Sequence, residues 1–362
     1  MQQDTTKESR AGTTRDWGMT LTNPSIKTDI NKRIHDILFK EDPEKARRFK
    51  EYRQAFDRAA HLDVELDFPI HLIVEAIYAC NYRCPQCYLG ISQFKKQFGG
   101  QGLMSMESYR KIVDEAERYR TPSMLLNGVN EPLLDDHLIE RMQYARDHGF
   151  IDIHLHSNGE LLTEELCHQI IDAGCTRFMI SLDAFSADTF SKIRVGGNYD
   201  KVLENVEMFL EVRRKKSAEL PVFRVSMVRQ KANEHEIQPF IDYWVPRADY
   251  VYMQTYQELV NTRNFNYYSS APDEIPPSFR CEQPWYAMFI RPKGDALPCC
   301  SFMNYYLKMG NVFETSVHDV WHAPPYREIR ALHQRGEFYK NDACQKCVTG
   351  MSPEAAAEEV SS

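Results

Sequence analysis

The sequence predicts an α/β fold, more narrowly a partial (β/α)6 barrel, and three observations support it. Six short runs rich in β-branched and aromatic residues alternate with longer amphipathic segments between residues 69 and 256. Three cysteines directly follow the first of these runs, at the carboxyl end of a strand, where parallel α/β folds bind their ligands. A second group of cysteines lies after residue 280. The alternation by itself fits a doubly wound open sheet equally well.

The amino-terminal segment predicts a tail and two helices. Residues 1 to about 25 are polar and unpatterned, as expected of a mobile tail. Between Asn31 and Ala60, apolar residues recur at near-helical spacing, and Asp42 followed by Pro43 interrupts the pattern. The charged residues of this segment indicate a solvated face. We therefore expect a flexible tail and a helical extension at residues 1–65.

Six strands and five helices are expected in the barrel, at residues 66–260. The expected strands are residues 70–77 (IHLIVEAI), 123–128 (SMLLNG), 151–156 (IDIHLH), 177–184 (RFMISLDA), 222–228 (VFRVSMV) and 250–256 (YVYMQTY). The expected helices are residues 105–119, 134–148, 163–173, 199–215 and 234–243. Because helices separate the strands, neighbouring strands should pair in parallel.

The carboxyl-terminal region is expected to form a small second domain at residues 261–350, with a disordered tail at residues 351–362. Tyr286–Arg291 and Ala296–Cys300 have the pattern of a β-hairpin that turns through Pro-Lys-Gly-Asp. A helix near the last cysteine pair completes the expected domain.

Composition limits the function classes. The formal net charge is −8, which argues against a broad nucleic-acid-binding face. The apolar runs stay below the roughly 18 residues of a membrane span, and the start of the chain lacks the apolar core of a signal peptide. A cytoplasmic location follows as an expectation. Its cysteines should then stay reduced, so clustered ones indicate metal ligands rather than disulfides.

The first cysteine group is Cys80, Cys84 and Cys87, in the segment YACNYRCPQCYLG. Pro85 and the Tyr-Leu-Gly that follows the third cysteine favour a loop. A structural zinc site needs four ligands, and this loop holds no fourth cysteine or histidine. Three thiolates can instead bind a [4Fe–4S] cluster and leave one iron open for another ligand.

This loop after the first strand of a six-strand barrel resembles the radical S-adenosylmethionine (radical SAM) enzymes. The resemblance implies that the open iron binds the methionyl group of S-adenosylmethionine, whose cleavage yields a 5′-deoxyadenosyl radical. The segments NGVNEPLL, HSNG and SLD are similar to the family's cofactor-binding strand ends. By that match the expected cofactor contacts are Tyr88, Asn130, Glu131, Ser157, Asn158, Ser181 and Asp183.

The second cysteine group is Cys281, Cys299, Cys344 and Cys347, with four residues between Gly294 and the second cysteine. It resembles the Twitch form of the SPASM extension, which implies four ligands around one auxiliary [4Fe–4S] cluster. A four-cysteine zinc site is the alternative by spacing alone. Of the remaining cysteines, Cys167 and Cys175 are expected to be buried core residues.

Cys300 follows a predicted cluster ligand directly. Strand alternation predicts that its side chain points to the opposite face, which favours a core position. As a minority alternative, it is the candidate catalytic thiol that would donate hydrogen to a substrate radical.

The resemblance implies an oxidoreductase that needs S-adenosylmethionine, two [4Fe–4S] clusters and an electron donor such as flavodoxin or ferredoxin. The single auxiliary cluster is similar to that of 2-deoxy-scyllo-inosamine dehydrogenase-type enzymes. The expected reaction is oxidation of an alcohol of a small sugar or aminocyclitol to a ketone, with the auxiliary cluster accepting an electron. The alternatives are an epimerase with a cysteine hydrogen donor, a maturase of peptides and, outside the enzymes, a zinc-binding scaffold.

Overall fold

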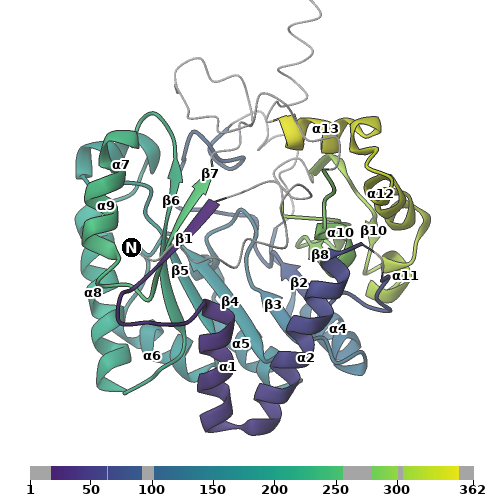
Figure 1. The fold of residues 1–362 in the computed structure, drawn as a ribbon, viewed down its shortest axis with the longest axis horizontal. Helices are drawn as coiled ribbons and strands as arrows, with labels where there is room; N and C mark the ends of the chain where they lie inside the picture. The colour runs from purple at the N-terminus through teal and green to yellow at the C-terminus, as the bar shows by residue number, and fades with distance from the viewer. Residues whose placement is uncertain (1–17, 63, 92–101, 256–278, 301–304, 350–362) are drawn as a thin grey trace, which may run out of the picture.

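The computed structural model describes residues 18–62, 64–91, 102–255, 279–300 and 305–349. Within these residues, ten strands form one sheet in the order β1-β7-β6-β5-β4-β3-β2-β8-β9-β10 (Figure 1). The strands are β1 Gly18–Thr22, β2 His71–Val74, β3 Ser123–Leu125, β4 Asp152–Ser157, β5 Arg177–Ser181, β6 Val222–Arg229, β7 Tyr250–Thr255, β8 Ala287–Ile290, β9 Asp295–Leu297 and β10 Gly310–Asn311.

The helices lie between these strands and at the carboxyl end of the described chain. The α-helices are α1 Ile30–Glu41, α2 Pro43–Ala60, α4 Met106–Arg118, α5 Leu138–Asp147, α6 Glu164–Asp172, α7 Ala187–Ile193, α8 Tyr199–Lys215, α9 Ile237–Trp244, α10 Gln283–Tyr286, α11 Val317–Trp321, α12 Pro324–Gln334 and α13 Asp342–Thr349. Short 3-10 helices are η1 Pro132–Leu134, η2 Glu234–Glu236 and η4 Phe338–Lys340. None of the helices in the described ranges combines the length and apolar character needed to cross a membrane.

The predicted α/β fold is confirmed. Strands β2 to β7 pair in parallel, in chain order, and form an unclosed partial barrel. Each of the six matches a strand expected from the sequence, and the break between α1 and α2 falls at Asp42 as expected. Helix α7 was not expected, because seven residues are too few for helical periodicity to stand out.

The expectation of an unstructured tail is wrong for Gly18–Thr22, which form β1. This strand pairs antiparallel with β7, the last strand of the barrel. Its main-chain groups occupy an edge that would otherwise expose unpaired donors and acceptors. Residues 1–17 of the expected tail, like the expected C-terminal tail at residues 351–362, lie outside the described residues.

The predicted hairpin is confirmed as β8 and β9, which pair antiparallel. Strand β8 also pairs in parallel with β2, so the carboxyl-terminal region continues the sheet of the barrel. Tyr326 of α12 binds the hairpin to this helix, because its hydroxyl donates to the carbonyl of Leu297 at 3.1 Å. The division into domains at residues 66–260 and 261–350 stays a prediction.

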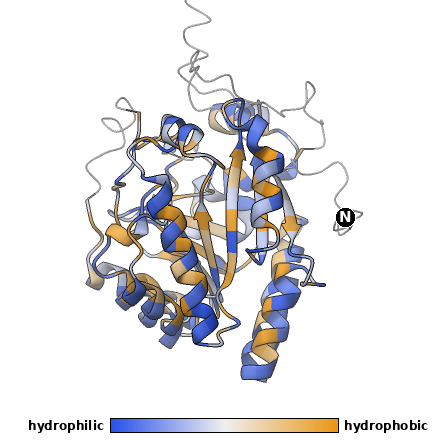
Figure 2. Ribbon diagram, turned by 90° about the vertical axis from the view of Figure 1, so that its left-hand side faces the viewer, coloured by the Kyte–Doolittle hydropathy of each residue, from blue (hydrophilic) through white to orange (hydrophobic). Residues whose placement is uncertain are grey.

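The two faces of the barrel strands differ in chemistry. The outward-facing side chains are apolar and packed under the helices: Leu72, Val74, Met124, Ile153, Leu155, Phe178, Ile180, Phe223, Val225 and Val251 are each at most 2 % exposed. The inner face carries polar side chains, namely His71, Ser123, Asp152, His154, His156, Arg177 and Arg224. In Figure 2 the flanking helices have both hydrophobic and hydrophilic stretches, as expected of helices with one buried face.

Helices α1 and α2 cover the amino end of the sheet. Ile34 and Phe49 pack with Ile151, Val222 and Tyr250, which lie at the beginnings of strands or directly before them. This apolar contact closes one end of the inner face and leaves the other end, at the carboxyl ends of the strands, for ligands.

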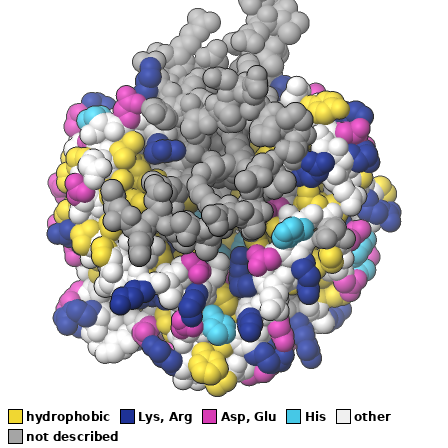
Figure 3. All heavy atoms as spheres, viewed as in Figure 1, with side chains coloured by type: hydrophobic (Ala, Val, Ile, Leu, Met, Phe, Trp, Pro, Cys, Tyr) yellow, Lys and Arg dark blue, Asp and Glu magenta, His cyan; other side chains and the backbone are white. Residues whose placement is uncertain are grey.

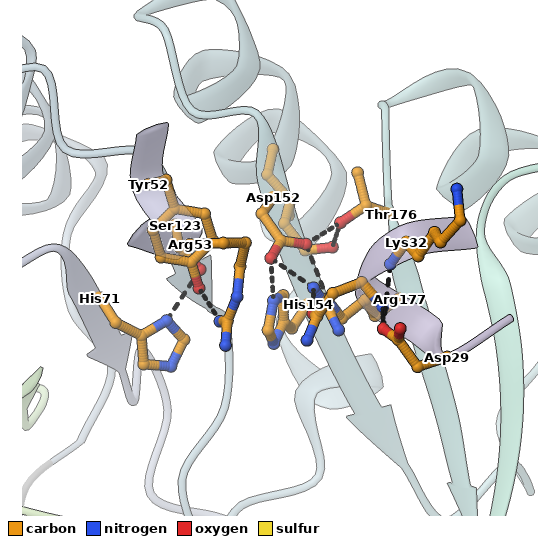
Figure 4. Close-up of polar contacts among 12 residues, drawn as sticks. Asp29, Lys32, Tyr52, Arg53, His71, Ser123, Asp152, His154, Thr176 and Arg177 are labelled. Atoms are coloured by element: carbon orange, nitrogen blue, oxygen red, sulfur yellow. Dashed lines mark hydrogen bonds and ion pairs between the residues drawn. The ribbon is translucent and has the colours of Figure 1, made fainter. Parts of the chain in front are cut away.

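A buried ion-pair network lies between these helices and the inner face (Figure 4). Asp152 accepts hydrogen bonds from Arg177 and Thr176, at 2.9 and 2.7 Å, and pairs with His154 at 3.0 Å. Burial opposes ionisation of Asp152, but Arg177 and His154 outweigh it and hold its pKa well below the ordinary value. Arg177 also donates to Asn31 of α1 at 2.9 Å and so ties the helix to the sheet.

The outer surface mixes both signs of charge. On the face in Figure 3, acidic and basic side chains are interspersed over the described residues. Several form exposed pairs within one helix, such as Arg214 with Glu211 at 2.7 Å. Exposed pairs of this kind contribute little to stability.

We predict that Arg177→Gln destabilises the fold by about 3–5 kcal/mol, because it leaves the buried Asp152 carboxylate without its guanidinium partner. Arg214→Gln removes an exposed ion pair and should leave the unfolding midpoint nearly unchanged. Anaerobic denaturant unfolding of the two variants compares them directly. Equal unfolding midpoints would contradict a structural role for the buried network.

Candidate functional site

The three-cysteine loop leaves the carboxyl end of β2 and folds back on itself. The amide of Cys87 donates to the carbonyl of Cys84 at 3.0 Å, and the amide of Gly90 donates to the carbonyl of Cys87 at 2.8 Å. A Cβ atom at position 90 would lie 2.0 Å from the carbonyl oxygen of Cys84. The loop therefore requires glycine at its end, because another side chain would collide with the backbone that holds the second cysteine.

The three thiols of this loop lie near one another and near a cation. Burial raises the pKa of Cys80 to about 11 and that of Cys87 to about 12, and the neighbouring Cys84 raises both further. Burial also raises the pKa of Cys84, while the guanidinium of Arg194 lowers it and hydrogen-bonds the thiol. Such neutral, crowded thiols in the protein alone would ionise on binding a metal centre.

The spacing of the thiols bears on which metal centre fits. Zinc–sulfur bonds of about 2.3 Å place tetrahedral ligands roughly 3.8 Å apart. Among the described residues, three or more ligand atoms come within 4.8 Å of one another only at Asp67, His318 and His322, so neither cysteine group closes around a single ion. A [4Fe–4S] cluster binds each thiolate on a different iron and so fits wider spacing.

Glu131, Ser157 and Asn158, three predicted cofactor residues, come together beside this loop. The Glu131 carboxylate accepts hydrogen bonds from the Ser157 hydroxyl and from the amide of Asn158, both at 2.7 Å. The amide of Glu131 donates to the carbonyl of Ala79, next to the first cysteine, at 2.9 Å. The carboxylate is 2 % exposed, and burial raises its pKa to about 7 although these hydrogen bonds oppose the rise.

Asn81 of the cysteine loop extends this arrangement. Its side-chain oxygen accepts from Asn158 at 2.8 Å, and its side-chain nitrogen donates to Glu160 at the same distance. The loop and the end of β4 are thus held together by side chains as well as by the backbone. Sequence reasoning missed Asn81 and Glu160, because only the fold brings them together.

The other predicted cofactor residues have structural partners. Asn130 accepts from the amide of Gly128 at 2.7 Å and closes the turn after β3. Asp183, at φ 61°, accepts from the amide of Val228 at 2.8 Å and pairs with Arg194 at 2.8 Å. Asp183 therefore orients the guanidinium that contacts Cys84. A direct contact of Asn130 or Asp183 with the cofactor stays a prediction.

Tyr88 and Ser181 occupy different surroundings. Tyr88 is fully buried, and its ring centre lies 4.9 Å from that of Tyr305. Ser181 ends β5 on the inner face, level with Ser226 of β6. Their predicted contacts with the cofactor stay untested.

Arg194 is the main residue of this site that the sequence did not indicate. It follows α7, eleven positions after Asp183, and it lies between Asp183 and Cys84. Burial opposes its charge, but Asp183 and the thiol of Cys84 outweigh burial and raise its pKa. A single arginine outside any periodic pattern gives no sequence signal of its own.

The second cysteine group is partly assembled. Burial raises the pKa of Cys281 well above its ordinary value, and the neighbouring Cys347 and Cys344 add to the rise. Cys299 lies near Tyr326. Burial is the main cause that raises the pKa of Tyr326, and the charge of Cys299 adds to the rise. The role of Cys299 as the fourth ligand stays a prediction.

Cys300 is exposed, contrary to the core position expected from strand alternation. Desolvation of its thiol raises the pKa to about 11, and the nearby Cys347 adds to the rise. The alternation does not apply, because β9 ends at Leu297 and Pro298 follows it. Cys167 and Cys175 are buried, as expected.

A buried polar group lies between the two cysteine regions. Glu75, directly after β2, accepts from the amide of Val129 at 3.0 Å and lies 3.8 Å from the Nε of Arg291. The Arg291 guanidinium stacks over the rings of Tyr78 and Tyr305, at 5.0 and 4.3 Å from their centres. Burial raises the pKa of Glu75 to about 7, and Arg291 opposes the rise.

Comparisons with known families and sequences match both cysteine regions. The family model described as the Radical SAM superfamily matches residues 74–243, and the SPASM model, an iron–sulfur cluster-binding domain, matches residues 281–348. A probable GTP 3′,8-cyclase of Saccharolobus solfataricus is 30 % identical over 171 residues, which cover 47 % of this chain and 51 % of that protein. The chain thus spans about half the length of the curated relatives it matches.

Solved structures share the fold at low sequence identity. Streptococcus suis SuiB bound to S-adenosylmethionine has a TM-score of 0.56 at 16 % identity, covering 87 % of this chain and 88 % of that one. Native anSMEcpe with bound AdoMet has a TM-score of 0.53 at 14 % identity, covering 78 % of this chain and 88 % of that one. BtrN in complex with AdoMet and 2-DOIA has a TM-score of 0.48 at 16 % identity, covering 76 % and 92 %.

We predict that changing Cys80, Cys84 and Cys87 together to alanine halves the iron content, from about eight to about four per chain, and abolishes cleavage of S-adenosylmethionine. The second cysteine group should keep its cluster. Cys167→Ala, at a buried cysteine outside both groups, is the control and should keep all the iron. Formation of 5′-deoxyadenosine by the anaerobically reconstituted triple variant would show that another site carries this chemistry.

Glu131→Gln should weaken S-adenosylmethionine binding roughly tenfold or more, because a charge-assisted hydrogen bond is worth about 1.5–3 kcal/mol. Since the Glu131 pKa is raised to about 7, its carboxylate ionises as pH rises through that value. Wild-type affinity for an ammonium group should therefore increase between about pH 6 and about pH 8, and the variant should lose this dependence. Equilibrium binding on protein with unchanged iron measures both effects, with the exposed Glu165→Gln as control. Wild-type affinity in Glu131→Gln would exclude the contact.

Proposed function

The chain belongs to the radical SAM superfamily and carries a SPASM domain, and on this premise we propose that it oxidises an alcohol of a small polar substrate to a ketone. Its cofactors are S-adenosylmethionine and two [4Fe–4S] clusters. The substrate we propose is a sugar or aminocyclitol. We propose flavodoxin or ferredoxin as the electron donor.

The residues of the chain divide the work between two sites. We propose that Cys80, Cys84 and Cys87 hold one cluster, and that Cys281, Cys299, Cys344 and Cys347 hold the other. When bound, these groups and S-adenosylmethionine supply a 5′-deoxyadenosyl radical that takes hydrogen from an unactivated C–H bond, and an acceptor for one electron.

The chain's own part is to bind and orient the methionyl group. We propose that the Glu131 carboxylate accepts a hydrogen bond from the ammonium of the methionyl group. The Ser157 hydroxyl and the amide of Asn158 hold the Glu131 carboxylate in place. Arg194 holds a positive charge beside Cys84 and favours its thiolate. Asp183 keeps this arginine oriented.

The observation that carries the proposal is the polar inner face of the barrel. His154, His156 and Arg224 are partly exposed there, although their neighbours on the outer face are at most 2 % exposed. The inner face is closed at the amino end of the strands. Polar groups along such a face suit a hydroxyl-rich or charged small molecule better than an apolar one. The cover of α1 and α2 at the amino end limits the depth of this space.

The proposed oxidation balances without a nicotinamide. The substrate carbon that bears the hydroxyl loses one hydrogen atom. The resulting radical then loses the hydroxyl proton and one electron, and the carbon–oxygen bond becomes double. One S-adenosylmethionine is converted to methionine and 5′-deoxyadenosine, and the electron returns to the protein.

A second candidate function rests on the sequence relatives. The chain is 30 % identical to a probable GTP 3′,8-cyclase over 171 residues. A cyclase acting on a purine nucleotide is therefore the alternative. Incubation with GTP, S-adenosylmethionine and a reductant tests it, and we expect no GTP-derived product by mass spectrometry.

We predict that the product of the true substrate is lighter by two mass units and carries no deuterium on the oxidised carbon after turnover in D2O. An epimerase would instead return a product of unchanged formula with one deuterium gained. Cys300→Ala adds a second readout. An epimerase that uses this thiol would lose product formation, while an enzyme that oxidises the alcohol would keep it. A product of unchanged mass would replace oxidation with epimerisation.

A further inference from the structure

Arg224 is a cation of the inner face that lacks a carboxylate partner. Its Nε is buried and donates to no partner among the described residues, and its described contacts are the Met179 sulfur at 3.5 Å and the Tyr252 ring at 5.8 Å. Neither contact neutralises a full charge. A guanidinium in such surroundings is costly without an anion, which here must come from outside the described chain.

Many other arginines with low exposure in the described ranges are paired. Arg141, Arg177, Arg194, Arg213 and Arg330 each have a carboxylate oxygen at 2.9 Å or less. Asp152, the acid of the inner face whose charge still reaches Arg224, is already bonded to Arg177, His154 and Thr176. Arg224 therefore lacks the carboxylate that these arginines have, as does Arg229 at the end of β6, whose Nε is also buried without a partner in the described residues.

His156 lies beside Arg224 on the same row of the sheet. His156 of β4 is level with Met179 of β5, which is level with Arg224 of β6. Two strand spacings separate the two backbones, about 10 Å, so their long side chains flank Met179. The Nε2 of His156 is also buried without a partner in the described residues. Two orphaned polar groups on one row of the inner face indicate a ligand that contacts both.

The sum of charge on this part of the inner face is positive. Burial is the main cause that holds the pKa of His156 well below its ordinary value, and that of His71 at about 3, so both imidazoles are neutral. Arg177 is balanced by Asp152, and Arg224 remains unbalanced. The chain as a whole has a net charge of −8, so this positive site is local.

We infer that Arg224 and His156 bind an oxyanion of the substrate, a carboxylate or a phosphate, at the end away from the reacting carbon. A planar guanidinium matches either group with two parallel hydrogen bonds, and a neutral imidazole can complete the contact. The inference rests on the proposed function only in taking the inner face as the substrate site. It narrows the substrate to an acidic or phosphorylated small molecule.

We take the anion to be separate from the carboxylate of S-adenosylmethionine because of the depth of Arg224. Glu131, Ser157 and Asn158 lie at or beyond the carboxyl ends of their strands. Arg224 is level with Met179, which lies two residues before Ser181, about 7 Å along the strand. A ligand on Arg224 therefore lies deeper in the barrel than the predicted cofactor contacts.

Equilibrium dialysis of the reconstituted holoprotein with S-adenosylmethionine tests the inference, with radiolabelled inorganic phosphate and malonate as probes. We expect one saturable site for at least one probe, weakened tenfold or more in Arg224→Gln, partly kept in Arg224→Lys and unchanged in the exposed Arg214→Gln. The tighter probe tells phosphate from carboxylate. The affinity for S-adenosylmethionine should stay the same in Arg224→Gln. Because no turnover is measured, the result is independent of whether the enzyme oxidises its substrate.

Peptide mapping after phenylglyoxal treatment of the wild type keeps the test valid if Arg224→Gln does not fold. We expect Arg224 to be modified and the bound probe to protect it. Failure of both probes to bind would overturn the inference, as would equal binding by Arg224→Gln, which would mean an adventitious ion only. A loss of S-adenosylmethionine affinity without loss of probe binding would assign Arg224 to the cofactor instead.

Discussion

Side-chain alternation along six parallel strands in register is the constraint on which the rest of this structure depends. Because successive side chains point to opposite faces, burying Ile153 and Leu155 under the helices directs His154 and His156 inward. The same alternation directs Arg224 inward, since Phe223 and Val225 pack outward. Parallel pairing also brings the strand ends to one edge, so that loops far apart in sequence meet there. The polar interior and the cysteine loop at its rim both follow from this register.

Sequence periodicity was sufficient for much of the fold and insufficient for its edges. The barrel strands were predictable because each buries one apolar face, and α1 and α2 because their apolar residues recur at helical spacing. Strand β1 and the pairing of β8 with β2 were missed. Both depend on main-chain hydrogen bonds to an available edge, which leave no pattern in the side chains.

The residues of the candidate site were likewise predictable only in part. Glu131, Ser157 and Asn158 were found from short motifs and do come together, because each follows or ends a strand of the sheet. Arg194 was missed, since its place beside Cys84 is set by tertiary structure. The core position expected of Cys300 was wrong, because the alternation was extended past the point at which β9 ends.

The two cysteine regions are joined by strand pairing and by buried side-chain contacts, and this bears on how an electron returns from one cluster to the other. Strand β8 pairs with β2, and Glu75 of the barrel lies against Arg291 of the hairpin in a buried group with Tyr305. A buried pair of this kind favours one relative placement of the two regions. A fixed placement suits repeated one-electron exchange between two centres better than a hinged one.

The most direct test of the proposed oxidation is its electron balance. The protein, with the first compound found to increase 5′-deoxyadenosine formation, is primed with less reductant than enzyme, and ketone is counted against electrons supplied. Oxidation predicts more than one ketone per electron, because each turnover returns the electron to the protein. Product that never exceeds the electrons supplied would contradict the account.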